Sequence, residues 1–222
     1  GGAVLVSDGV LTLDHCSFNG SVGRDDEYTR GGAVAVHGGK VRIVSCVFEE
    51  LRSTEGGALF VRGGSVVVSS SEFIGNSAVS RSQLPATPGA GSGGAIGVRC
   101  LNGVPVRPYF DNCSFRRNTA DQSGGAFYIA GTGSFVIAAC SFIENECSLE
   151  GAAVAFDSSG FLSTELRPRF EGHNHFNAGS RGRSTVYYFF GVVEWQCNAG
   201  QYAPRTGTLR GSFSGCPFSC SA

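Results

Sequence analysis

The side chains best suited by type and spacing to do chemistry are nine cysteines, together with scattered acidic residues and histidines. Cysteines can form disulfides, bind a metal or supply a thiolate nucleophile. Four of them stand two residues before a phenylalanine at one position of a repeat: Cys16, Cys46, Cys113 and Cys140. A cysteine content this high is uncommon in cytosolic proteins, so it favours an oxidising, extracellular location.

The other five cysteines are the stronger candidates for disulfides. We expect one bridge between Cys100 and Cys147. A second bridge is expected among Cys197, Cys216 and Cys220. A zinc site at Cys216 and Cys220 is an alternative, but the second close-spaced pair of ligands typical of structural zinc is missing. Because nine is an odd number, at least one sulfur stays a thiol or pairs outside this chain.

The acidic residues do not form the pattern that a polysaccharide-cleaving site needs. Such a site requires carboxylates gathered on one face, as an acid–base pair or as calcium ligands. Five aspartates instead fall at different positions of the repeat described below: Asp8, Asp14, Asp111, Asp121 and Asp157. His173 and His175 would face one side of a strand, but the spacing supplies no third metal ligand. We therefore predict no catalytic, cofactor-binding or metal-binding residues.

The spacing of these residues follows a repeat that runs through most of the chain. Each copy opens with Gly-Gly-Ala, continues through short apolar runs and closes with Cys-x-Phe, or Ser-x-Phe in one copy. The triplet begins at residues 1, 31, 56, 93 and 124, with a degenerate Gly-Ala-Ala copy at 151. A period of 25 to 37 residues is typical of stacked repeat architectures.

The pattern inside each copy indicates strands. The apolar runs are short, alternating and rich in β-branched residues, and glycine-containing turns separate them. No stretch has an apolar face at helical spacing, which excludes the helical solenoids. The sequence therefore predicts an all-β parallel β-helix of about six coils over residues 1–195, followed by a short cysteine-rich segment over 196–222.

In a parallel β-helix, equivalent residues of successive coils lie about 4.8 Å apart, one above another. The repeat therefore predicts inward ladders of cysteine, phenylalanine and asparagine. Three copies carry Phe-x-x-Asn, ending at Asn76, Asn118 and Asn145. We expect the four ladder cysteines to be buried thiols that pack as small hydrophobes. Disulfides between adjacent coils, Cys16 to Cys46 and Cys113 to Cys140, are the alternative.

Two stretches resemble known families. Gly93-Gly94-Ala95-Ile96 together with Phe115-Arg116-Arg117-Asn118 is similar to the repeats of the chlamydial polymorphic outer-membrane proteins and of related β-helix proteins in protists and algae. This resemblance covers residues 1 to about 170, and it implies a right-handed β-helix with a surface-exposed adhesive or structural role. The segment from Cys197 to Cys220 resembles the start of an ephrin-receptor-like cysteine repeat, which implies a truncated module.

Charge and sequons bear on the partners and the location. A formal net charge of −1 over 222 residues gives no electrostatic case for nucleic acid or an anionic membrane. No apolar run is long enough to span a bilayer. N-glycosylation sequons occur at Asn19-Gly20-Ser21 and Asn112-Cys113-Ser114. With the cysteine content, they favour a secreted glycoprotein outside the cell or at its surface.

These features favour a non-catalytic structural or adhesive module, a rigid rod within a larger surface protein or filament. The expected partners are other protein subunits and components of the extracellular matrix or cell wall, with carbohydrate as a further candidate. The alternative is a β-helix protein that binds or degrades polysaccharide, because that fold often carries such sites. The chain has no methionine and begins inside a repeat, so we expect it to be a piece of a longer protein.

Overall fold

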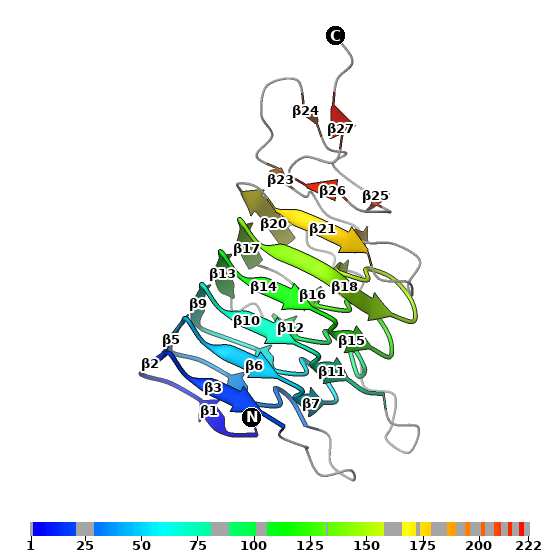
Figure 1. Cartoon of the computed structure of the whole chain (residues 1–222). Coiled ribbons are helices and arrows are strands. Elements are labelled where there is room, and N and C mark those ends of the chain that lie inside the picture. The colour runs from blue at the N-terminus through cyan, green and yellow to red at the C-terminus, as the bar shows by residue number, and fades with distance from the viewer. Residues whose placement is uncertain are drawn as a thin grey trace.

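Short strands separated by tight turns stack on one another as a parallel β-helix, as Figure 1 shows. The computed structural model describes residues 2–20, 29–80, 89–100, 106–131 and 133–157. It also describes the shorter ranges 166–171, 174–178, 186–189, 194–195, 201–202, 207–209, 213–214 and 218–219. Within these residues every regular element is a strand, so the predicted all-β solenoid is confirmed.

Three parallel sheets run along the stack, and each of the first six coils contributes one strand to each sheet. The first sheet contains β1 (Val4–Val6), β4 (Val34–Val36), β8 (Leu59–Val61), β12 (Ile96–Arg99), β16 (Phe127–Ala130), β19 (Val154–Asp157) and β22 (Val186–Phe189). The second contains β2 (Val10–Asp14), β5 (Lys40–Val44), β9 (Ser65–Ser69), β13 (Arg107–Asp111), β17 (Gly133–Ala138), β20 (Leu166–Glu171) and β23 (Glu194–Trp195). The third contains β3 (Ser17–Asn19), β6 (Val47–Glu49), β10 (Glu72–Ile74), β14 (Ser114–Arg116), β18 (Ser141–Cys147) and β21 (His175–Ala178).

Short strands after the third sheet carry the chain toward the next coil: β7 (Arg52–Ser53), β11 (Ser77–Ala78) and β15 (Thr119–Ala120). Strands β22 and β23 belong to a seventh coil, where about six were predicted. Beyond it the pairing changes direction. Strand β25 (Gly207–Leu209) is antiparallel to β22, and β26 (Phe213–Ser214) is antiparallel to β21. Strand β24 (Gln201–Tyr202) pairs with β27 (Phe218–Ser219).

The Gly-Gly pair that opens each repeat is a requirement of close stacking. The first glycine of the pair has a positive φ of 64° to 73° at residues 31, 56, 93 and 124. The second glycine lies directly over the next coil. A Cβ atom on Gly57 would stand 2.0 Å from the carbonyl oxygen of Gly94, and one on Gly94 would stand 2.0 Å from that of Gly125. Only glycine fits where the coils approach this closely.

The phenylalanine ladder is the largest apolar feature of the core. Successive rings stack with centroids 4.7 to 5.0 Å apart and interplanar angles of 3° to 14°. The stack comprises Phe18, Phe48, Phe73, Phe115, Phe142 and Phe176. All but Phe18, in the first coil, are completely buried. The predicted phenylalanine ladder is thus confirmed.

The asparagine ladder joins coils through buried amides, also as predicted. The Asn118 Oδ1 accepts hydrogen bonds from the backbone N–H of Asn76 at 3.0 Å and from its Nδ2 at 2.9 Å. Asn145 serves Asn118 in the same way. Each Nδ2 also donates to a backbone carbonyl, that of Phe48 for Asn76 and that of Phe73 for Asn118. These bonds satisfy polar groups that would otherwise be costly to bury.

At the position of the sulfur ladder, a serine and an asparagine make the same kind of hydrogen bonds as the cysteines do. In coil three, the Ser71 Oγ accepts the backbone N–H of Cys46 at 3.0 Å and donates to the carbonyl of Ser69 at 2.8 Å. The Cys46 thiol likewise donates to the carbonyl two residues before it, at 3.2 Å. After Cys140 the position is filled by Asn174, whose Oδ1 accepts the Cys140 N–H at 2.8 Å. This position thus requires a side chain that both accepts and donates a hydrogen bond.

This rule predicts the effect of substitutions at Ser71. Ser71→Ala leaves the buried N–H of Cys46 without its acceptor, so we expect the free energy of unfolding to fall by about 1 to 3 kcal/mol. Ser71→Cys restores the acceptor with a group that already occupies this position in four other coils, and it is expected to change stability by less than the alanine variant does. Urea denaturation of both variants measures the difference. Equal losses for the two would contradict the rule.

Two bends at positive φ recur in each of the first five coils, and most of the residues there are not glycine. After the second-sheet strand, residues His15, Ser45, Ser70, Asn112 and Ala139 have φ of 48° to 51°. After the third-sheet strand, φ is 53° to 62° at Gly20, Glu50, Gly75, Arg117 and Glu144. Because the left-handed region costs an L-residue roughly 1 kcal/mol, the bends are imposed by stacking rather than by local preference.

Replacing one of these residues by glycine should relieve the strain. Glu144 is exposed and occupies the bend that Gly20 and Gly75 fill in other coils. We expect Glu144→Gly to raise the free energy of unfolding by up to about 1 kcal/mol. Ser65→Gly is the control, since Ser65 is exposed in a regular strand where glycine destabilises. A loss of stability in Glu144→Gly as large as in the control would argue against strain at the bend.

Candidate functional site

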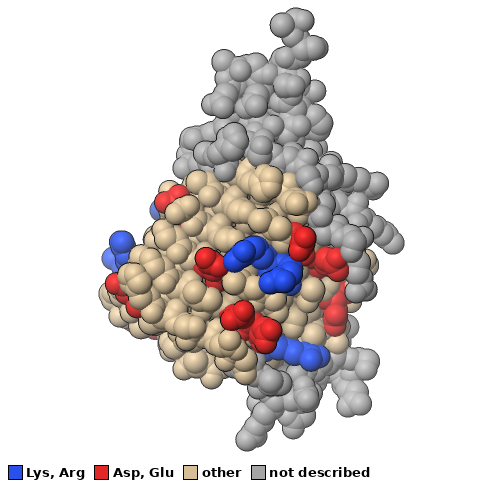
Figure 2. Space-filling view, in the orientation of Figure 1, with Lys and Arg blue, Asp and Glu red and all other residues tan. Residues whose placement is uncertain are grey.

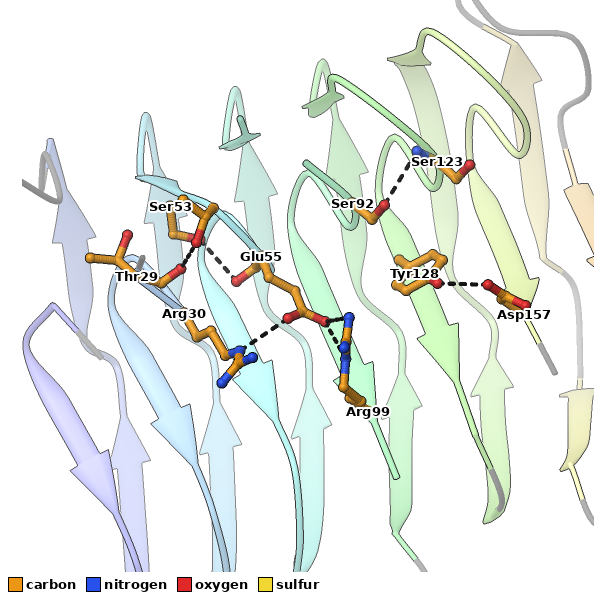
Figure 3. A network of polar contacts seen from close by, with 10 residues as sticks. Thr29, Arg30, Ser53, Glu55, Ser92, Arg99, Ser123, Tyr128 and Asp157 are labelled. Carbon is orange, nitrogen blue, oxygen red and sulfur yellow. Dashed lines mark hydrogen bonds and ion pairs between the residues drawn. The ribbon is translucent and has the colours of Figure 1, made fainter. Parts of the chain in front are cut away.

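A network of charged and polar side chains lies on the outer face of the first sheet, and Figure 3 shows its members. The residue before each Gly-Gly pair occupies the same position in its coil. At this position Arg30, Glu55 and Ser92 form successive parallel bridges from one coil to the next. Below them, Phe60, Gly97 and Tyr128 are in register across β8, β12 and β16. Three coils therefore bring their polar side chains to one place.

The network is centred on the Glu55 carboxylate. Its Oε2 accepts from the Arg30 Nε at 3.1 Å, and its Oε1 accepts from the Arg99 Nε and Nη2, each at 2.9 Å. The Glu55 side chain is 0% exposed, that of Arg99 8% and that of Arg30 28%. The Arg30 guanidinium also lies 5.1 Å from the centroid of the Phe60 ring, a cation–π distance. One buried anion thus lies between two cations.

Glycines make room for this arrangement. A Cβ atom on Gly97 would stand 3.1 Å from the Glu55 Cγ, so the missing side chain leaves space for the Glu55 stem to pass over the sheet. Gly89 has a φ of 78°, and a Cβ there would stand 1.8 Å from the Arg99 Nη2. The backbone at Gly89, a few residues before the Gly93-Gly94 pair, therefore packs directly on the ion pair.

A second polar pair lies beside the first. The Tyr128 hydroxyl donates to the Asp157 Oδ2 at 2.8 Å. Burial, followed by the nearby Asp157 carboxylate, raises the pKa of Tyr128 well above its usual range. The tyrosine is therefore a neutral donor and not a nucleophile.

Two threonines lie beside this network. The Thr54 hydroxyl donates to the Thr29 carbonyl, whereas the Thr29 hydroxyl is buried without a hydrogen-bond partner in the described structure.

This chemistry suits a structural clamp better than a catalytic centre. A carboxylate held between two guanidiniums is stabilised as the anion, so Glu55 is not suited to donating a proton as a general acid. Its complete burial also separates it from solvent and from any large substrate. The cluster ties the outer face of coils two, three and four to one another and to the backbone at Gly89.

The structure places the four predicted ladder cysteines, Cys16, Cys46, Cys113 and Cys140, at one position of successive coils as thiols. Burial raises the pKa of the Cys46 and Cys140 thiols. Burial also raises the pKa of Cys147, to about 11. These three thiols are therefore protonated at neutral pH, the form that reacts slowly with oxidants.

The expected bridge between Cys100 and Cys147 is not formed. Cys147 is a thiol that packs with Ala120 and Ala152 in a small cluster of its own, whereas Cys100 lies in the main core. The two residues belong to different coils and to different sides of the solenoid, and the linear spacing of cysteines does not reveal this. Cys197, Cys216 and Cys220 lie outside the described residues, so the second bridge stays a prediction.

Both sequon asparagines are exposed in the structure. Asn19 ends β3, and its Nδ2 donates to the Glu49 Oε2 at 3.0 Å. Asn112 occupies the left-handed bend before β14 with φ of 50°, and its Nδ2 donates to the Ser70 Oγ at 3.4 Å. Asparagine tolerates that conformation better than most residues. Glycosylation of either residue stays a prediction.

Charged residues elsewhere on the described surface are mixed in sign. Figure 2 shows Lys and Arg interspersed with Asp and Glu on the face that carries the third sheet. An example is the half-exposed pair of Arg116 and Glu72, with Nη2 and Oε2 2.9 Å apart. Within the described ranges, no three His, Cys, Asp or Glu side chains gather closely enough to hold a metal ion. The same ranges contain no helix long and apolar enough to cross a membrane.

Sequence reasoning missed the charge network, although a signal was present. The residue immediately before each glycine-initiated repeat is Arg30, Glu55, Ser92, Ser123 or Glu150. These residues occupy the same position in successive repeats. The first two, Arg30 and Glu55, have opposite charges, so they can pair along the stack. Arg99 had no such signal, because only the register of β12 on β8 brings it to Glu55.

Comparisons with models of protein families, with curated proteins and with solved structures find no match. The resemblance to the chlamydial repeats and to the ephrin-receptor-like module therefore stays a prediction.

Removing the central anion tests the clamp. Glu55→Gln keeps the shape of the side chain but leaves the buried Arg99 guanidinium without its counter-ion. Breaking a buried ion pair in this way typically costs about 3 to 5 kcal/mol of stability. Glu72→Gln is the matched control, since its pair with Arg116 is half exposed and is expected to contribute less than about 1 kcal/mol. Denaturant unfolding of both variants gives the comparison, and similar small losses would show that the network does not hold the fold.

Proposed function

We propose that this chain is a non-catalytic rod segment of an extracellular structural or adhesive assembly. The observation that carries the proposal is the continuity of the interior ladders. Stacked phenylalanine rings run from Phe18 to Phe176 without a gap. Buried side-chain hydrogen bonds run beside them, as between Asn76 and Asn118.

Such an interior supports stiffness along the axis. Bending the stack would open spacings between coils on one side, and each opened spacing would separate stacked rings and buried hydrogen bonds together. Losing one buried hydrogen-bond partner already costs about 1 to 3 kcal/mol. Stacked repeat proteins in general place their binding surfaces along such a scaffold. A spacer or a display scaffold is therefore the role that this construction supports best.

An extracellular location is supported by the cysteines and the sequons. Burial raises the pKa of the Cys46, Cys140 and Cys147 thiols, so these three are protected from oxidation even in an oxidising compartment. Asn19 and Asn112 are exposed, as glycan acceptors must be. The alternative function is polysaccharide binding or cleavage on the same scaffold. Cleavage predicts that a polysaccharide incubated with the protein becomes shorter.

The proposal is tested on the protein isolated from its source. Electron cryomicroscopy is expected to show the rod in lateral or axial contact with further protein subunits or with matrix material. Incubation with plant, algal and animal polysaccharides is expected to leave polymer length unchanged in size-exclusion chromatography. Shortening of a polymer by the folded protein, but not by the heat-unfolded protein, would replace this proposal with the enzymatic alternative.

A further inference from the structure

The outer face of the second sheet carries cations at every other coil. In β5, Lys40 and Arg42 are exposed while Val41 and Ile43 are buried. In β13, two coils further on, Arg107 is exposed while Pro108 and Phe110 are buried. Strands β2, β5, β9, β13 and β17 lie one on another along one side of the rod in Figure 1.

Register places these cations in two straight rows. Row one consists of Lys40, Ser65 and Arg107, and row two consists of Arg42, Val67, Tyr109 and Val136. In β20, the backbone register continues row two from Val136 to Arg169 and places Arg167 opposite Ser134. Basic residues therefore occur in coils two, four and six, and neutral residues lie in coils three and five. Adjacent coils are about 4.8 Å apart, so the cationic levels are roughly 10 Å apart.

The cations of this face are available to a ligand. Within the described structure, no acidic side chain forms an ion pair with Lys40, Arg42 or Arg107. Three acidic residues of the sheet occupy a third row, at the end of their strands: Asp14, Asp111 and Glu171. Glu194 of β23 is opposite Arg169 and ends row two. Rows one and two thus form a cationic strip along the rod axis, and the third row borders this strip with acidic residues on one side.

We propose that this strip binds a linear acidic polysaccharide whose carboxylate or sulfate groups recur about once per disaccharide. The polymer lies along the rod axis, and its anions meet the cations of alternate coils. The half-exposed Tyr109 lies in the same strand as Arg107, and in row two it is two coils from Arg42 and two coils from the backbone position of Arg169. Its ring can pack there against the apolar face of a sugar. Val67 and Val136 provide flat contact surface on either side of it. The inference rests on the proposed non-catalytic role, since it names the matrix polymer that the rod holds.

The spacing of the strip argues for this class of polymer over other polyanions. A nucleic-acid strand presents a phosphate about every 3.4 Å of duplex axis, which is far denser than cations repeating at roughly 10 Å. An anionic membrane surface favours dense clusters of Lys and Arg. A sugar chain with one charge per disaccharide is extended and sparsely charged, and it matches a sparse single strip.

The experiment uses fluorescently labelled oligosaccharides of hyaluronan and of unsulfated chondroitin, each with one carboxylate per disaccharide, and anisotropy is the readout. Lys40→Ser, Arg42→Thr and Arg107→Ser are combined in one variant, using residue types that already fill these rows in other coils. We expect binding at least about tenfold weaker than that of the native protein, because three exposed charge contacts are lost. Binding of the native protein should also weaken as salt is raised. The control variant combines Arg52→Ser, Arg116→Ser and Arg117→Ser, which removes the same charge from outside the second sheet, and it should bind as the native protein does.

Several outcomes would overturn the proposal: no binding of either polymer by the native protein, equal weakening in the control variant, or equal binding of neutral dextran. Tighter binding of single-stranded oligothymidine or of phosphatidylserine vesicles would show that the strip serves another polyanion. Circular dichroism of both variants checks that each is folded. Polymer length after incubation separates the two proposals. Binding with cleavage would remove the non-catalytic role and keep the strip, whereas absence of binding would remove the strip and keep the rod.

Discussion

Each coil of this protein depends on its neighbours to satisfy polar groups that it has buried. The backbone N–H of Asn76 is satisfied by Asn118, and that of Cys46 by Ser71, each one coil away. A shift of register by one residue would move every inward side chain outward and leave these groups unpaired. The bonds therefore specify register as well as stability, and the sheets, the phenylalanine stack and the outer faces all follow from that register.

The same register explains why much of the fold was predictable from the sequence. Glycine pairs, alternating apolar runs and Cys-x-Phe recur at one phase, and a phase repeated along a chain specifies which residues stack. The phenylalanine and asparagine ladders follow directly from that argument. The left-handed bends at Glu50 or Arg117 do not, because these residue types carry no turn signal. Their conformation is imposed by the coil above and the coil below.

The parts that could not be predicted depend on the distances between elements of different phase. Glu55 and Arg99 are 44 residues apart, and they meet because Gly97 and Gly89 leave space around their side chains. Cys100 and Cys147 were expected to pair because both are outside the sulfur ladder, but the coil separates them. The cationic strip was hidden for another reason: a net charge of −1 averages over faces whose local charge differs.

The position shared by Cys46, Ser71 and Asn174 has a consequence for inheritance. What the fold requires there is a hydrogen-bonding role, and three chemically different residues already perform it within this one chain. A lineage can exchange such residues by single substitutions with little loss of fitness, while the spacing of glycines and the backbone path persist. Over long divergence, chains of this kind would keep their architecture and lose the identities by which relatives are recognised.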